Sequence, residues 1–129
     1  MGGIVAEGSV KTILVVEDDV AISGILTKTL DSSGYITEAI FDGAAAVPRA
    51  VDLLPDAILL DVNLPNLDGF SIAKQLKATK ETKRIPIIFL TAQDRPMDVI
   101  SGIQAGAKHY LTKPFKLPEL LEKVAKLFK

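Results

Sequence analysis

The chain alternates between short apolar runs and stretches whose apolar residues recur at helical spacing, and this pattern occurs five times along its 129 residues. A short continuous apolar run is typical of a buried strand, whereas recurrence every three or four residues is typical of a helix that packs through one face. Repeated strand and helix units favour a parallel sheet covered by helices. The length suits one domain. We therefore predict a single-domain α/β sandwich of five βα units.

The apolar runs and stripes locate the expected elements. The expected strands are Thr12–Glu17, Tyr35–Ile40, Ala57–Leu60, Pro86–Leu90 and Lys108–Leu111. The expected helices are one that ends near Gly34 and packs through Ile22, Ile25, Leu26 and Leu30, one at about 43–54, one that packs through Phe70, Ala73 and Leu76, one from about Pro96 to Gly106, and a last one that packs through Leu117, Leu120, Leu121, Val124 and Phe128. Pro48 should kink the second helix or delay its start, because proline has no backbone N–H to donate. Residues 1–10 are expected to form a flexible tail.

The composition of the strands predicts their order. The first, third and fourth are apolar without alternation, as expected of central strands covered on both faces. The second contains Thr37 and Glu38, which indicates an edge strand. Right-handed crossovers then favour the doubly wound, flavodoxin-like order 2-1-3-4-5. Strands one and three lie side by side in this order, and ligands bind beyond their carboxyl ends.

Composition and charge exclude several classes of function. The chain has no cysteine, which removes disulfide scaffolds and thiol nucleophiles and fits a reducing compartment. Its formal net charge of −1 and lack of a long basic run argue against direct binding of nucleic acid. The apolar runs are far shorter than the roughly 18 residues that a membrane span needs. We therefore expect a soluble, cytoplasmic domain.

Charged and hydroxyl side chains follow the predicted strands at the edge where ligands bind. Strand one runs into Glu17 and Asp18, strand three into Asp61, strand four into Thr91, and strand five is followed by Lys113. We interpret the neighbouring Asp19 as a helix N-cap and not as a ligand.

The expected meeting of Asp18 and Asp61 across adjacent strands indicates a cation site, because clustered carboxylates repel one another. Oxygen ligands of this kind suit Mg²⁺, which binds one or two carboxylates and completes its shell with water and phosphate oxygens. Lys113 and Thr91 would then bind phosphoryl oxygens, Lys113 through its positive charge and Thr91 as a hydrogen-bond donor. A carboxylate in this setting is a competent nucleophile toward phosphorus.

We assign the roles from position in the chain. Asp61 follows a buried strand and is the expected nucleophile. Asp18 is the expected direct metal ligand, Glu17 a ligand that acts mainly through water, and Asn63 a ligand through its backbone carbonyl.

These residues belong to segments that resemble the receiver domain of bacterial two-component response regulators. The matching segments are Ile13–Asp19, Leu59–Gly69, Phe89–Ala92, Ala105–Ala107 and Tyr110–Phe115. They occur in the family's order and spacing and extend the resemblance over about residues 11 to 128, so 11–129 is the expected receiver domain. Glu17 departs from the pattern, because many members have Asp there. This change should alter cation affinity more than chemistry.

The resemblance implies that Asp61 accepts a phosphoryl group from a phosphohistidine of a sensor histidine kinase or a histidine phosphotransfer protein. It implies a requirement for Mg²⁺ and a cis peptide bond between Lys113 and Pro114. The residues expected to hold the phosphoryl group are Thr91, Ala92, Lys113 and Val62. Asn63 and Gln93 flank the expected path of a hydrolytic water and would set the lifetime of the phosphoryl group.

The resemblance also implies a conformational switch. Thr91 would move onto the phosphoryl group and Tyr110 would rotate inward, which biases the surface formed by the helix at Pro96–Gly106, the strand before Lys113 and the last helix. That surface is also the expected dimer contact, and it would act on a downstream protein target or on an effector domain. We interpret His109 as an ordinary edge residue.

Two other functions compete with the phosphorylated switch. A small Mg²⁺-dependent phosphatase would also use an aspartyl phosphate, but that class places a second Asp where this chain has Asn63. A receiver-like interaction module that never takes phosphate would ordinarily lack one of Asp18, Asp61 and Lys113, and all three are present. We therefore do not expect an enzyme beyond the domain's own phosphorylation and dephosphorylation.

Overall fold

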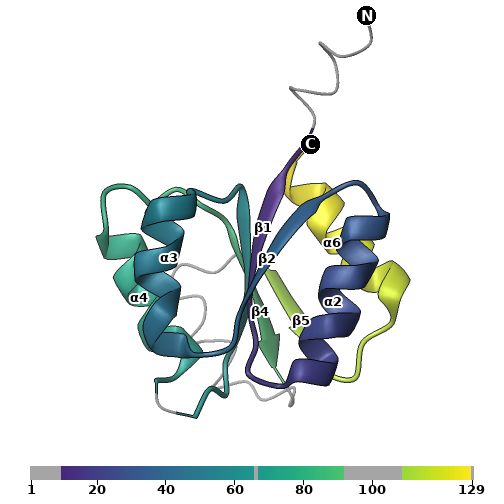
Figure 1. Ribbon diagram of the computed structural model, residues 1–129, viewed down its shortest axis with the longest axis horizontal. Coiled ribbons are helices and arrows are strands. Elements are labelled where there is room, and N and C mark those ends of the chain that lie inside the picture. The colour runs from purple at the N-terminus through teal and green to yellow at the C-terminus, as the bar shows by residue number, and fades with distance from the viewer. Residues whose placement is uncertain (1–9, 66, 92–108, 129) are drawn as a thin grey trace, which may run out of the picture.

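The predicted apolar runs form one parallel sheet. The structure is a computed structural model that describes residues 10–65, 67–91 and 109–128. Its strands are β1 (Thr12–Val16), β2 (Ile36–Ile40), β3 (Ala57–Asp61), β4 (Ile87–Thr91) and β5 (His109–Thr112). They lie in the order β2-β1-β3-β4-β5 and every neighbouring pair is parallel (Figure 1). The predicted doubly wound fold is confirmed.

Helices cover both faces of this sheet. The described helical elements are α2 (Val20–Ser32), the 3₁₀ turn η1 (Gly43–Ala45), α3 (Ala46–Leu53), α4 (Gly69–Ala78) and α6 (Leu117–Leu127). α3 and α4 lie on one face, and α2 and α6 lie on the other (Figure 1). The helix expected at Pro96–Gly106, and residues 1–9 of the tail expected at 1–10, lie outside the described residues. None of the helices in the described ranges is long and apolar enough to cross a membrane.

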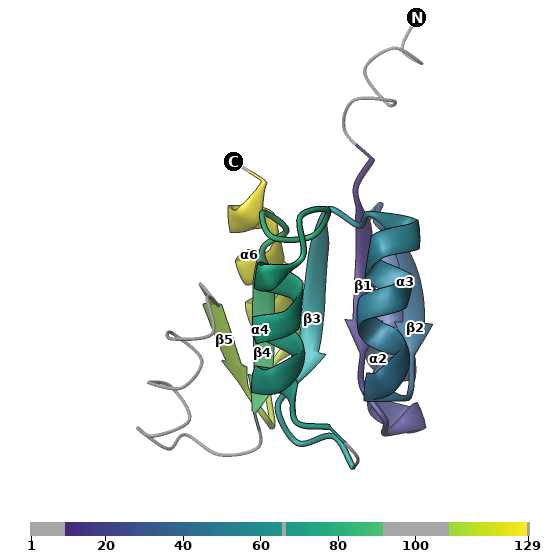
Figure 2. The ribbon, with the colours of Figure 1, turned by 90° about the vertical axis from the view of Figure 1, so that its left-hand side faces the viewer.

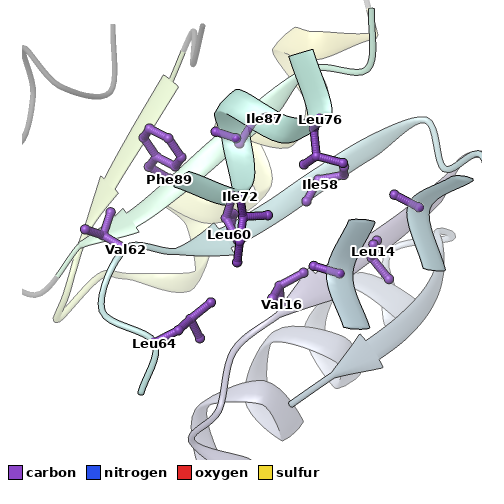
Figure 3. Close-up of a cluster of buried hydrophobic side chains, with 13 residues drawn as sticks. Leu14, Val16, Ile58, Leu60, Val62, Leu64, Ile72, Leu76, Ile87 and Phe89 are labelled. Carbon is purple, nitrogen blue, oxygen red and sulfur yellow. The ribbon is translucent and has the colours of Figure 1, made fainter. Parts of the chain in front are cut away.

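The inner strands bury both of their faces, because successive side chains of a strand point in opposite directions. On β1, Leu14 and Val16 join a cluster with residues of α3 and α4, while Ile13 and Val15 join a second cluster with residues of α2 and α6. β3 and β4 divide their residues in the same way. Figure 3 shows the first cluster. Burial of each large aliphatic side chain stabilises the folded protein by roughly 1.5–3 kcal/mol, so the helices on both faces stabilise the sheet.

Pro48 delays its helix as predicted. The segment begins with the 3₁₀ turn at Gly43–Ala45, and the α-helix begins only at Ala46. Pro48 therefore lies in the first turn of α3, where a backbone N–H has no partner within the helix and its absence costs little.

The prediction for Ile25 is wrong. Its side chain is 51% exposed. The buried residues of α2 are Ser23, Leu26 and Leu30, and this spacing of three and four residues leaves Ile25 outside the packed stripe. Leu117 at the start of α6 is also exposed, at 41%. The two exposed residues both line a groove described below.

Candidate functional site

The carboxyl ends of the parallel strands share one edge of the sheet (Figure 2), and the acidic residues meet there. Val16 pairs with Leu60, so Glu17 and Asp61, the next residue of each strand segment, lie side by side. Glu17 is 1% exposed and Asp61 is 3% exposed, whereas Asp18 is exposed. Carboxylate oxygens of these three residues lie within 4.8 Å of one another. The structure thus brings together the three acids that the sequence singled out.

Lys113 reaches into this cluster from the segment after β5. Its Nζ lies 2.5 Å from Glu17 Oε1 and 3.3 Å from Asp61 Oδ2. The backbone fixes where this side chain starts, because the Lys113 N–H donates to the carbonyl of Thr91 over 2.7 Å. The peptide bond from Lys113 to Pro114 is cis, as the resemblance implied.

The loop after β3 contributes one hydrogen bond to the Asp61 carboxylate. The Asn63 N–H donates to Asp61 Oδ1 over 3.0 Å. The Val62 N–H donates to the Leu90 carbonyl over 2.9 Å, so this amide already has a partner within the sheet. The backbone N–H that holds the carboxylate from this loop therefore belongs to Asn63.

Gly69 is a site residue that the sequence analysis missed. Its N–H donates to the Val62 carbonyl over 2.9 Å. A Cβ at this position would lie 2.3 Å from the carbonyl oxygen of Asp61 and 2.9 Å from Val62 Cα. The signal available in the sequence was the pair Asp68-Gly69, which indicates a turn but not which backbone the turn approaches.

Asp19 caps the following helix, as predicted. Its Oδ1 accepts the N–H of Ile22 over 3.1 Å. Its own N–H donates to Glu17 Oε2 over 3.1 Å. Asp19 therefore also helps to fix the Glu17 side chain through its backbone.

Burial governs the electrostatics of this cluster. It raises the pKa of Glu17 from 4.5 to about 7, although hydrogen bonds from Lys113 and from the Asp19 N–H oppose the shift. Burial alone would lower the pKa of Lys113. The hydrogen bond to Glu17 and the charges of Asp61 and Glu17 outweigh that effect and raise it.

The residues present fit a divalent cation. Three carboxylates and one ammonium leave a formal charge of −2 within a few ångströms. Every ligand that the three acids offer is a hard oxygen, which suits Mg²⁺ and not zinc or copper. Glu17, Asp18 and Asp61 would hold such an ion.

Thr91 lies on β4, at the same edge of the sheet as the acids, and Tyr110 lies on the neighbouring strand β5. Thr91 ends β4 and is 4% exposed. Tyr110 pairs with Phe89, and the centroids of their rings are 5.6 Å apart. Burial raises the pKa of Tyr110. Ala92 and Gln93 lie outside the described residues.

The raised pKa of Glu17 predicts a pH-dependent stability. Between pH 4.5 and about 7 the folded protein holds a proton on Glu17 that the unfolded chain releases. The contribution of Glu17 to the free energy of unfolding is therefore fully present below pH 4.5 and is lost as pH rises through about 7. Urea unfolding in a chelator should show this loss.

The control for that measurement is Glu17→Gln, which removes the titrating group and retains the shape of the side chain. The wild type should lose stability relative to Glu17→Gln as pH rises through about 7. Parallel stability profiles for the two proteins would contradict the assignment.

Comparison of the sequence with protein families and curated proteins gives consistent matches. The family described as the response regulator receiver domain matches residues 13–125. RpaA of Synechocystis, a DNA-binding dual master transcriptional regulator, is 40% identical over 117 residues, which cover 91% of this chain and 48% of RpaA. The response regulator MprA of Mycobacterium ulcerans is 41% identical over 117 residues, which cover 91% of this chain and 50% of MprA. The chain thus spans about half the length of these relatives.

Solved structures with the same fold are also similar in sequence. The receiver domain of a Pseudomonas aeruginosa sensor histidine kinase is 38% identical, with a TM-score of 0.85 and coverage of 92% of this chain and 98% of that one. That structure has a magnesium ion coordinated in its active site cleft. The Vibrio cholerae chemotaxis protein CheY4 is 31% identical, with a TM-score of 0.88 and coverage of 92% and 99%.

Proposed function

The chain belongs to the response regulator receiver domain family of two-component signal transduction, and we propose that Asp61 is its phosphoacceptor. The proposed donor is a phosphohistidine of a sensor histidine kinase or a histidine phosphotransfer protein. The observation that supports this assignment is the buried Asp61 carboxylate with the Lys113 ammonium 3.3 Å away and two further acids around it.

In this proposal a carboxylate oxygen of Asp61 attacks the phosphorus of the phosphohistidine. A P–O bond forms, the P–N bond breaks, and the imidazole nitrogen leaves with the electron pair and takes up a proton. Glu17, Asp18, Asp61 and the Asn63 carbonyl would hold Mg²⁺. When bound, the ion neutralises charge on the phosphoryl oxygens. Lys113 faces the same oxygens as a positive charge.

The remaining contacts to the phosphoryl group come from the ends of β3 and β4. Thr91 would supply its hydroxyl, with Ala92 next to it. Val62 would contribute its amide only if its hydrogen bond to Leu90 gives way. Asn63 and Gln93 would set the lifetime of the phosphoryl group through access of water, and the domain's chemistry would be limited to gaining and losing that group.

Tyr110 is the proposed reporter of phosphorylation. Its ring contacts Phe89, which in turn lies edge-on to Phe70 of α4 with ring centroids 4.8 Å apart. A movement of Thr91 toward Asp61 would change the packing at the end of β4, and Tyr110 on the neighbouring strand would follow. The surface of residues 96–106, β5 and α6 would then bind a downstream protein target, an effector domain or a second copy of the chain.

An apolar groove beside Lys113 supports a protein donor. A cavity of about 380 Å³ is lined by Ile22, Ile25, Lys113, Pro114, Phe115 and Leu117. A second hollow along α2 and α6 shares Ile25 and Leu117 with it. Lys113 lines this groove and its Nζ lies 3.3 Å from Asp61 Oδ2, so a partner that brings a phosphohistidine to Asp61 would find apolar contact beside the site. We propose that the donor packs a helix into this groove. The proposed compartment is the cytoplasm, which agrees with the lack of cysteine in the sequence.

The groove predicts a selective loss in the variant Ile25→Asp. Ile25 is 51% exposed, so the substitution leaves the core intact. The protein donor is chosen from a panel of phosphorylated histidine phosphotransfer domains as the one that phosphorylates the wild type fastest. With that donor, the phosphorylation rate of the variant should be about tenfold lower or more, as for loss of an apolar residue central to an interface. With phosphoramidate, which needs no docking, the rate should not change.

Leu54→Asp provides the matched control. Leu54 is 55% exposed but follows α3 on the other face of the sheet. It has φ of 51°, a left-handed conformation that Asp tolerates better than leucine. Its rates with both donors should equal those of the wild type. Equal rates for Ile25→Asp and the wild type with the protein donor would overturn the proposed contact.

The assignment of Asp61 is tested by chemical mapping of the wild-type protein. Incubation with phosphoramidate and Mg²⁺ should add one phosphoryl group per chain, detected by intact mass, and hydroxylamine should remove it because an acyl phosphate is labile to that nucleophile. In a separate sample that has not met hydroxylamine, borohydride should reduce the acyl phosphate and so mark the peptide that contains Asp61. A modified peptide elsewhere, or no gain in mass, would refute the proposal.

A further inference from the structure

A polar cavity lies at the opposite edge of the sheet from the acidic cluster. Its volume is about 320 Å³, and the residues that line it are Arg84, Pro86, His109, Lys126 and Leu127. They come from the segment before β4, the start of β5 and the end of α6, which lies beside the amino ends of the strands (Figure 1). The five residues of β4, at about 3.3 Å per residue, separate the two edges. This cavity is therefore distinct from the site that contains Asp61.

The charged side chains that line the cavity are positive. Arg84 and Lys126 are cationic, and the imidazole of His109 has a ring N–H in either neutral tautomer. No acid lines the cavity within the described part of the chain. Glu122 lies 4.0 Å from the Lys126 ammonium, but both side chains are more than half exposed, and such a pair is weak. Arg84 has no ion pair within the described ranges, so both cations are available to an anion.

The backbone that carries Arg84 is fixed by contacts on both sides of it. The Lys77 ammonium donates to the carbonyl of Lys83 over 3.2 Å and to that of Ile85 over 2.8 Å. Thr82, two residues before Arg84, is fully buried. A site whose backbone is already in place loses less entropy when a ligand binds. This wall of the cavity is therefore formed before any ligand arrives.

The lining indicates the chemistry of the ligand. Two cationic side chains balance a doubly charged anion, and a phosphate monoester carries a charge of about −1.5 to −2 at pH 7. An arginine binds phosphate oxygens through two parallel N–H groups, and a lysine adds a point charge. Pro86 and Leu127 supply an apolar wall that can contact carbon atoms. A cavity of this size is at the lower end of the range for small-molecule sites.

We propose that this cavity binds a small organic phosphate monoester. Arg84, Lys126 and the His109 ring surround its phosphate group, and Pro86 and Leu127 contact its carbon atoms. The proposal assigns a binding role to His109, which the sequence analysis interpreted as an ordinary edge residue. It does not depend on the phosphorylation of Asp61, because the two sites lie at opposite edges of the sheet.

The first test is a titration of ¹⁵N-labelled protein with phenyl phosphate, followed by NMR. A chelator is present, so that no divalent cation holds the probe beside Asp61. The amide signals of His109 and Leu127 should shift and reach saturation, whereas those of Asn63 and Lys113 at the other edge should stay in place. Shifts confined to the edge that contains Asp61, or no saturable shift at all, would overturn the proposal.

Two further probes separate the phosphate group from the carbon atoms. Inorganic phosphate has the charge without the ring, and phenol has the ring without the charge. Phenyl phosphate should bind more tightly than inorganic phosphate, and phenol should cause no saturable shift. Equal affinities for the two phosphates would show an adventitious anion only, and saturation by phenol would show that the cations do not select the ligand. Either result would overturn the proposal.

Arg84→Gln tests the site, and Lys80→Gln is the matched control. Both residues are exposed and lie between α4 and β4, but only Arg84 lines the cavity. Arg84→Gln should weaken the binding of phenyl phosphate by about tenfold, which corresponds to about 1.4 kcal/mol. Lys80→Gln should leave it nearly unchanged, because salt screens an exposed charge outside the cavity. Equal weakening in the two variants would show general attraction by the basic segment and would overturn the site.

Discussion

Asp61→Asn should abolish phosphorylation of the domain by any donor. The amide has the shape of the carboxylate, and its oxygen can still accept the Asn63 N–H that Asp61 Oδ1 now accepts. An amide oxygen is a far weaker nucleophile than a carboxylate, so the chemistry is lost while the loop keeps its hydrogen bond. Intact mass after incubation with phosphoramidate and Mg²⁺ should show no phosphoryl group.

Asp68→Asn is the control for that result. Asp68 lies in the same loop and caps α4 by accepting the N–H of Ser71 over 2.9 Å. Asparagine is about as good an N-cap as aspartate. This variant should therefore be phosphorylated like the wild type. Labelling of Asp61→Asn to the wild-type level would mean that another residue takes the phosphoryl group.

Gly69→Ala should destabilise the protein and slow its phosphorylation. The new Cβ would lie 2.3 Å from the carbonyl oxygen of Asp61, a backbone atom that cannot rotate away. Relief requires a shift of either the start of α4 or the end of β3, at a cost of roughly 1–3 kcal/mol or more. Because the carbonyl oxygen that must shift belongs to Asp61 itself, we expect the rate of phosphorylation by phosphoramidate to fall as well. Urea unfolding and the phosphorylation rate measure the two effects.

Gly24→Ala is the matched control within a helix. Gly24 lies inside α2, and a Cβ there would meet nothing within 4 Å. Alanine is preferred to glycine in a helix by roughly 0.5–1 kcal/mol, so this variant should be more stable than the wild type. A destabilisation of the same size in both variants would contradict the role of the contact with Asp61.

The sequence was sufficient to predict the sheet and the meeting of its charged ends. Continuous apolar runs occur only where both faces of a strand are covered, and right-handed crossovers then limit the strand order. Once the order is known, Glu17, Asp18 and Asp61 must share one edge of the sheet.

The sequence did not reveal distances set by contacts between remote segments. The preference of Lys113 for Glu17 depends on the reach of two side chains that are 96 positions apart in the chain. The approach of Gly69 to Asp61 depends on the path of a loop whose composition indicates only a turn. Ile25 fits a helical apolar stripe as well as its neighbours do, and only the packing of α2 leaves it in the groove.

The sheet separates the apolar interior into two clusters that have no residue in common. One contains the residues of α3 and α4 behind the Asp61 strand, and the other contains those of α2 and α6 beneath the groove. Substitutions that adapt the groove to a different donor are therefore absorbed in one layer. Duplicated copies of such a gene can therefore diverge in the phosphodonor that they recognise while they retain the same phosphorylation chemistry.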